Sequence, residues 1–142
     1  MLKVNNIQKT FNPGTVHQVR ALQGFSLTLE QGSFVCVLGS NGSGKSTLLN
    51  AIAGTFPVDQ GTISLDGTDI TGWPEHKRAR YMGRVFQNPL SGTAPNMTIS
   101  ENISLALRRG KPRGLGPGIS RGKKEEYRQM VRPLNMDLEE RL

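Results

Sequence analysis

Cysteine is almost absent from this sequence, and long apolar runs are absent altogether. Cys36 is the single cysteine among 142 residues, which excludes an internal disulfide and predicts a buried, unreactive thiol between two valines. No apolar run approaches the ~18 residues that would suggest a spanning helix. The first residues alternate polar and apolar side chains without a signal-peptide core, so we expect a cytoplasmic protein.

Aromatic residues are also scarce, at 6% of the chain, while basic residues give a net charge of +7. Residues 108–142 carry +5 of this charge and residues 1–107 carry +2. A basic stretch could bind nucleic acid, but Tyr127 is its one aromatic residue, so it lacks a platform on which bases stack. We interpret it as a solvated basic loop and helix face, and we expect no specific nucleic-acid partner.

Apolar periodicity predicts a β-rich start followed by a change to helix. Alternation over residues 2–11 predicts a strand, and alternation up to Leu29 predicts a second, antiparallel strand after the Asn12-Pro13-Gly14 turn. Residues 34–38 are apolar at every position, which is typical of a strand covered on both faces. The period then becomes helical and stops at Gly54.

The remainder of the chain predicts shorter elements separated by turn residues. Asp66-Gly67 between short apolar runs indicates a hairpin. Six of the nine residues from Gly110 to Gly118 are Gly or Pro, which indicates a loop. The other expected elements are a short helix from Glu75, a strand ending near Gln87, a helix over residues 98–107 capped by Thr98 or Ser100, and a helix over residues 123–132.

The strongest motif is a glycine-rich loop between the apolar segment 34–38 and the following helix. It satisfies G-x-x-x-x-G-K-S/T in full, with a predicted strand before it and a predicted helix after it. Its glycines allow consecutive backbone N–H groups to turn inward around an anion, and the helix N-terminus points its positive end at the same anion. The residues of this P-loop are Gly39, Ser40, Asn41, Gly42, Ser43, Gly44, Lys45 and Ser46.

The residue types of the P-loop assign individual roles. Lys45 adds a full charge against the β- and γ-phosphates, Ser46 offers a hydroxyl to Mg²⁺, and Thr47 can contact the α-phosphate. A chance Gly/Ser linker is a poor alternative because both flanking elements are present. A dinucleotide fingerprint is excluded because its third glycine would fall on Thr47. The motif therefore predicts a nucleoside triphosphate with Mg²⁺.

Three further stretches in fixed order carry a resemblance to a known family. They are the opening IQKTF, the P-loop in the form GSNGSGKSTLLNAIAG, and GRVFQNP at residues 83–89, with the hairpin GTISLDGTDITGWP between the last two. From Leu2 to about Leu107 the chain resembles the N-terminal part of an ABC (ATP-binding cassette) ATPase. The resemblance implies that Phe11 stacks on adenine. It also implies that Gln87, the catalytic partner of Lys45, contacts Mg²⁺ and the attacking water.

The same resemblance implies a fold and a division of the chain. The fold is α/β: a P-loop NTPase core of mixed sheet and flanking helices, preceded by an antiparallel β subdomain and incomplete at the C-terminus. Residues 1–107 would form the N-terminal part of the ATPase domain. Residues 108–142 would form the basic Gly/Pro-rich loop and the start of the helical subdomain.

Three motifs that the family needs for turnover are not present in the sequence. The chain has no LSGGQ-type signature, no apolar strand ending in Asp-Glu (Walker B), and no switch histidine after Gln87. Leu90-Ser91-Gly92 directly follows the Gln87 segment and is therefore too early to be the signature. We expect this chain alone to bind Mg-ATP weakly without hydrolysing it, and to be poorly stable.

The function implied by the resemblance is that of the ATP-binding subunit of an ABC transporter. It would couple ATP hydrolysis to solute movement, with import of amino-acid-like solutes favoured over export. It would work at the inner face of the membrane with a membrane-spanning permease subunit and a second ATP-binding subunit. Two alternatives remain open: a soluble ABC ATPase that acts on nucleic acid or ribosomes, and a fragment that binds nucleotide without biological activity.

Overall fold

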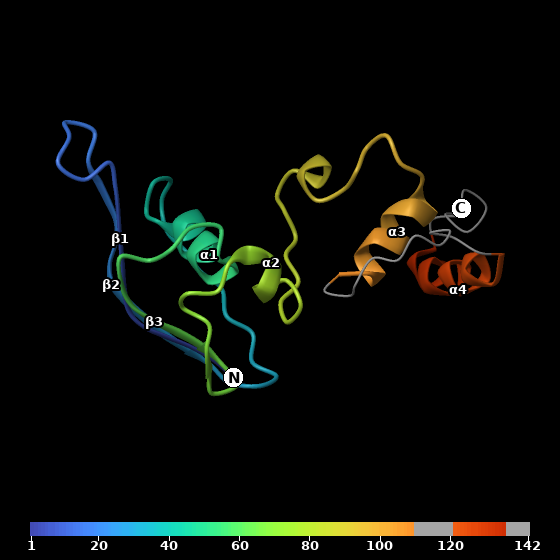
Figure 1. Cartoon of the computed structure of the whole chain (residues 1–142), viewed down its shortest axis with the longest axis horizontal. Helices are drawn as coiled ribbons and strands as arrows, with labels where there is room; N and C mark the ends of the chain where they lie inside the picture. Colours follow the sequence, from blue (N-terminus) through green and yellow to red (C-terminus); the bar gives the residue numbers. More distant parts are fainter. Residues whose placement is uncertain (110–120, 136–142) are drawn as a thin grey trace. The chain divides into compact units, whose positions relative to one another are not determined.

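The computed structural model describes residues 1–109 and 121–135, which divide into two compact units, Met1–Met82 and Gly83–Leu142 (Figure 1). Each unit is described by itself. The loop predicted at Gly110–Gly118 lies outside the described residues. The domain boundary predicted at residue 107 stays a prediction.

The first unit is built on an antiparallel sheet with the strand order β2-β1-β3-β4 (Figure 1). Its strands are β1 (Leu2–Phe11), β2 (Val19–Leu29), β3 (Gln60–Leu65) and β4 (Thr68–Asp69). Asp66 (φ 47°) and Gly67 (φ 79°) turn β3 into β4 with the two positive φ angles of a tight hairpin. The predicted antiparallel strands and hairpin are confirmed.

Helix α1 (Lys45–Ala53) packs its apolar side on this sheet. Leu48 and Ala51 from the helix are buried together with Val4 and Ile7 of β1 and Ile63 of β3. The predicted stop at Gly54 is confirmed, because Gly54 takes a left-handed conformation (φ 82°) and its N–H donates to the Asn50 and Ala51 carbonyls. The short helix α2 (Glu75–Arg78), also predicted, completes the unit.

Two predicted strands do not form. Residues 34–38 have no regular secondary structure, Phe34 and Leu38 are 93% and 85% exposed, and Cys36 is an exposed thiol, so its predicted burial is wrong. Residues 82–86, leading to Gln87, are likewise irregular. A strand is stable only within a ladder of neighbours, and no described strand pairs with either segment. Apolar composition alone was not sufficient.

Over residues 83–109 and 121–135, the second unit contains two helices, α3 (Ile99–Leu107) and α4 (Arg121–Val131), and two short 3₁₀ turns, η1 (Pro89–Ser91) and η2 (Arg132–Leu134). Both predicted helices are confirmed. Thr98 caps α3 in a capping box with Glu101, as expected from its position. Buried Tyr127 and Val131 give α4 its apolar contacts. In the parts of the chain that the structure describes, no helix has the length and apolarity needed to cross a membrane.

Candidate functional site

The P-loop leads directly into the N-terminus of α1, and no side chain caps this helix end. The cap residue is Gly44, the first turn contains no acidic residue, and the first intrahelical bond runs from Leu48 N–H to the Gly44 carbonyl at 2.8 Å. The first amides of a helix have no partner within the helix, and its dipole places positive charge there. This helix end therefore favours an anion.

Two glycines of the P-loop adopt backbone conformations that favour glycine. Gly42 and Gly44 have φ angles of 84° and 89°, in the left-handed region. Gly44 is also confined by its neighbour, because a Cβ added there would lie 2.7 Å from the carbonyl oxygen of Ala21 in β2. The end of the P-loop is thus held close against β2 by a glycine.

The ammonium group of Lys45 turns back over the loop that precedes it. Its Nζ donates to the carbonyl oxygens of Gly39 and Ser40, each at 2.7 Å, and lies 3.4 Å from the hydroxyl of Ser43. A turn bond from Ser43 N–H to the Ser40 carbonyl, at 3.2 Å, closes the loop. The loop carbonyls therefore hold the Lys45 ammonium in this structure, and a phosphate would take their place as its partner.

The residues predicted to assist phosphate and metal binding lie in the first turn of α1. Ser46 is exposed and Thr47 is half-buried, and both belong to the helix that starts at Lys45. Among the described residues no group of three or more His, Cys, Asp or Glu side chains could hold a metal by itself. The role of the Ser46 hydroxyl toward Mg²⁺ stays a prediction.

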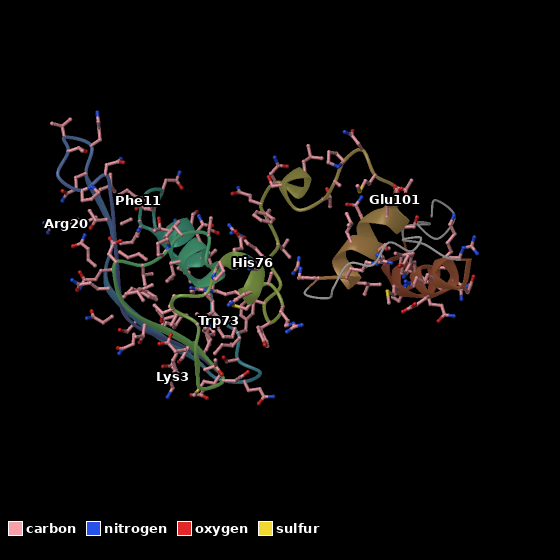
Figure 2. The ribbon with its side chains drawn as sticks, viewed as in Figure 1. Lys3, Phe11, Arg20, Trp73, His76 and Glu101 are labelled. Atoms are coloured by element: carbon pink, nitrogen blue, oxygen red, sulfur yellow. The ribbon has the colours of Figure 1, made fainter. Side chains whose placement is uncertain are left out.

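Phe11 is the last residue of β1 (Figure 2). Its half-buried ring packs edge-to-face against Phe56. The two ring centroids are 5.3 Å apart, and the planes meet at 84°. An open hollow of about 710 Å³ lies near this end of the sheet, and Phe11 does not line it. It is lined by Gln8, Thr10, Pro13, Gln18, Arg20, Leu22, Gln23 and Asp59.

Gln87 belongs to the second unit, where it follows the irregular segment 82–86 and is exposed. Next to it, the guanidinium carbon of Arg84 lies 4.4 Å from the ring centroid of Phe86. The role of Gln87 toward Mg²⁺ and water stays a prediction.

The sequence patterns did not single out Arg78, which anchors the other end of α1. Its buried guanidinium donates to the carbonyls of Ala51 and Ile52 in α1 at 2.9 and 2.8 Å, and to those of Thr71 and Trp73 at 2.8 and 2.9 Å. Burial lowers the pKa of Arg78, and the carboxylate of Asp69 opposes this shift. The cation compensates the negative end of the helix dipole.

A complete G-x-x-x-x-G-K-S/T loop that leads into an uncapped helix N-terminus is typical of the P-loop class of phosphate-binding proteins. The chain matches the ABC transporter family over residues 22–141, which is most of its length. The chain therefore belongs to the ABC transporter family, whose ATP-binding proteins bind and hydrolyse ATP.

Individual relatives agree with this assignment. The chain is 40% identical to the tyrosine transport ATP-binding protein of Clostridioides difficile, over the whole chain and 56% of the relative. It is 38% identical to the spermidine/putrescine import ATP-binding protein PotA of Haemophilus influenzae, over 76% of the chain and 27% of the relative. It thus spans about half, or less, of the length of these relatives.

Solved structures confirm the predicted P-loop NTPase fold. The ATP-binding cassette MJ0796 in a post-hydrolysis dimer bound to ADP and Pi superposes with a TM-score of 0.74 at 29% identity, covering the whole chain and 63% of that structure. A nucleotide-free cassette from an ABC transporter gives a TM-score of 0.70 at 28% identity, covering 92% of the chain and 52% of that structure.

Proposed function

We propose that this chain is the nucleotide-binding part of an ABC importer subunit. It binds Mg-ATP in the P-loop, and the subunit to which it belongs couples ATP binding and hydrolysis to the import of a small, amino-acid-like solute. The observation that carries the proposal is the uncapped N-terminus of α1, which begins with Lys45 and follows P-loop glycines with positive φ angles. The name of PotA supports import, and the name of the tyrosine transport relative supports an amino-acid-like solute.

The proposal includes partners and a location. The chain works at the cytoplasmic face of a membrane, with a membrane-spanning permease subunit and a second ATP-binding subunit. The dimeric cassette among the structural relatives supports pairing of two such subunits. Phe11 receives the adenine, Ser46 binds Mg²⁺, Thr47 contacts the α-phosphate, and Gln87 acts on the metal and the attacking water. Because the signature, Walker B and switch histidine motifs are not in this sequence, the chain by itself binds ATP without turnover.

Replacing Lys45 with Ala tests the nucleotide site directly. We expect the variant to lose about 1.5–3 kcal/mol of Mg-ATP affinity, the usual scale of hydrogen bonds to a charged group. Isothermal titration calorimetry on the full chain measures this loss. Lys3→Ala is the matched control, because Lys3 is an exposed lysine on β1 (Figure 2). Equal affinity of the Lys45 variant and the wild type would contradict the proposal.

Turnover and partner choice need separate measurements. The pure chain should not hydrolyse ATP. Steady phosphate release that is lost in the Lys45 variant would contradict this part of the proposal. Co-purification with a multi-spanning membrane protein is the result expected for an importer subunit. Co-purification with ribosomes or nucleic acid instead would favour a soluble ABC ATPase.

A further inference from the structure

Four side chains contact one another at the end of β1: Lys9, Phe11, Phe56 and Asp59. We refer to them as the Lys9 cluster. The Nζ atom of Lys9 lies 5.7 Å from the ring centroid of Phe11 and 5.5 Å from that of Phe56. Both distances are within the range of cation–π attraction. The rings themselves form the perpendicular pair described above.

The Lys9 side chain is held by an ion pair and is largely shielded from solvent. Its side chain is only 12% exposed, and its ammonium donates to Oδ1 of Asp59 at 2.8 Å. Asp59 is fixed in turn, because its Oδ2 accepts from Thr10 N–H at 2.7 Å and its own N–H donates to the Gln8 carbonyl at 2.9 Å. The position of the positive charge beside Phe11 is therefore set by the backbone of β1.

The Lys9 cluster lies in the part of the sheet that the P-loop approaches. Lys9 pairs with Leu22 of β2, and Phe11 pairs with Val19. Gly44 of the P-loop comes close to the carbonyl of Ala21, next to Leu22. Asp59 is the one member of the Lys9 cluster that also lines the hollow described above.

We propose that Lys9 and Phe56 are positioning residues that fix the Phe11 ring for stacking on the base of the nucleotide. The edge-to-face contact with Phe56 fixes the plane of the Phe11 ring. The Lys9 ammonium polarises the π electrons of the Phe11 ring. A ring polarised in this way stacks better on an electron-rich purine. This inference rests on the proposed function and adds that the Lys9 cluster contributes to binding of the base but not of the phosphates.

Comparing two ligands, Mg-ATP and inorganic triphosphate with Mg²⁺, distinguishes the contribution of the base to binding from that of the phosphates. Phe56→Leu and Lys9→Met should each weaken Mg-ATP binding by about 3- to 10-fold, the scale of one aromatic or cation–π contact. Both variants should leave the affinity for inorganic triphosphate unchanged. Lys9→Arg retains a cation beside Asp59 and should restore most of the ATP affinity. Calorimetry on the full chain gives each affinity, and circular dichroism shows that each variant is folded.

The controls distinguish this inference from the proposed function. Lys3→Met removes an exposed lysine from the same strand and should change neither affinity. Lys45→Ala should weaken both ligands. If Lys45→Ala does so while Lys9→Met and Phe56→Leu bind ATP like the wild type, or lose both ligands equally, the positioning role is wrong and the P-loop site stands. If the wild type binds neither ligand, the proposed function and this inference both fall.

Discussion

Among individual residues, Asp59 has the clearest pH-dependent role. The hydrogen bond from Lys9, followed by that from the Thr10 N–H, holds the pKa of Asp59 below its ordinary value of 3.8. A carboxylate with a lowered pKa in the folded state stabilises the protein above its unfolded pKa, and this contribution is lost as pH falls through the folded value. Asp59 should therefore stabilise the sheet at neutral pH and lose this stabilising contribution below about pH 4.

The variant Asp59→Asn tests this prediction. The unfolding free energy of the wild type should fall more steeply than that of the variant between about pH 5 and about pH 2, as measured by urea unfolding. Some decline should persist in the variant, because Asp69 and Glu101 also have lowered pKa values through hydrogen bonds with Thr71 and Thr98 respectively. Parallel pH profiles of the two proteins would contradict the role of Asp59.

The sequence predicted the residues of the site better than their environment. The P-loop was identified because its residue types are dictated by local backbone geometry, and Gly42 and Gly44 have the positive φ angles that favour glycine. The contacts of Phe56 and Arg78 were not predictable, because they join segments that are distant in the chain. One feature of the sequence does indicate the proximity of Lys9 and Phe11: they are two residues apart on a strand, so alternation places both on one face.

At the scale of elements, the two ends of α1 differ in how their backbone groups are satisfied. The N-terminal N–H groups have no side-chain cap and are available to an anion, whereas the guanidinium of Arg78 donates to the C-terminal carbonyls of Ala51 and Ile52. Replacing Arg78 with Met would leave these carbonyls, and those of Thr71 and Trp73, without this donor. We expect a loss of about 3 kcal/mol or more in the free energy of unfolding, since buried unpaired groups are costly.

Two measurements check the role of Arg78. Urea unfolding gives the loss of stability, with Lys77→Met as the control, because Lys77 is an exposed cation on the same helix. Hydrogen exchange should accelerate at the amides of Gly54 and Thr55, which bond to the Asn50 carbonyl at the end of α1. Equal stability of the two variants, or unchanged exchange at those amides, would show that Arg78 is dispensable.

Elements with local determinants were predicted well, and those that depend on partners were not. The β1–β2 and β3–β4 pairs follow from alternation and turn residues, and α3 follows from its capping box. Segment 34–38 has the composition of a buried parallel strand, but such a strand needs neighbours on both edges and layers on both faces. None of the described strands supplies them, so composition predicted a strand that does not form.

For the molecule as a whole, this exposed segment is the main liability. Phe34 and Leu38 expose most of their surface within a run of five apolar residues, whose backbone is not paired in any described ladder. Exposed apolar segments with free backbone groups associate with one another. We therefore expect the isolated chain to self-associate and to bind an apolar dye, despite the repulsion from its net charge of +7.

The double variant Phe34→Ser/Leu38→Ser should reduce both dye fluorescence and the associated fraction in sedimentation velocity. Val16→Ser/Val85→Ser is the matched control, because Val16 and Val85 are even more exposed, at 96% and 98%, but lie outside the segment. If exposure alone drove association, the control would reduce it at least as much. If the unpaired run of apolar residues drives it, only the first pair of substitutions will act. A wild-type chain that stays monomeric at high concentration would refute both explanations, since association would then be absent although the apolar surface remains.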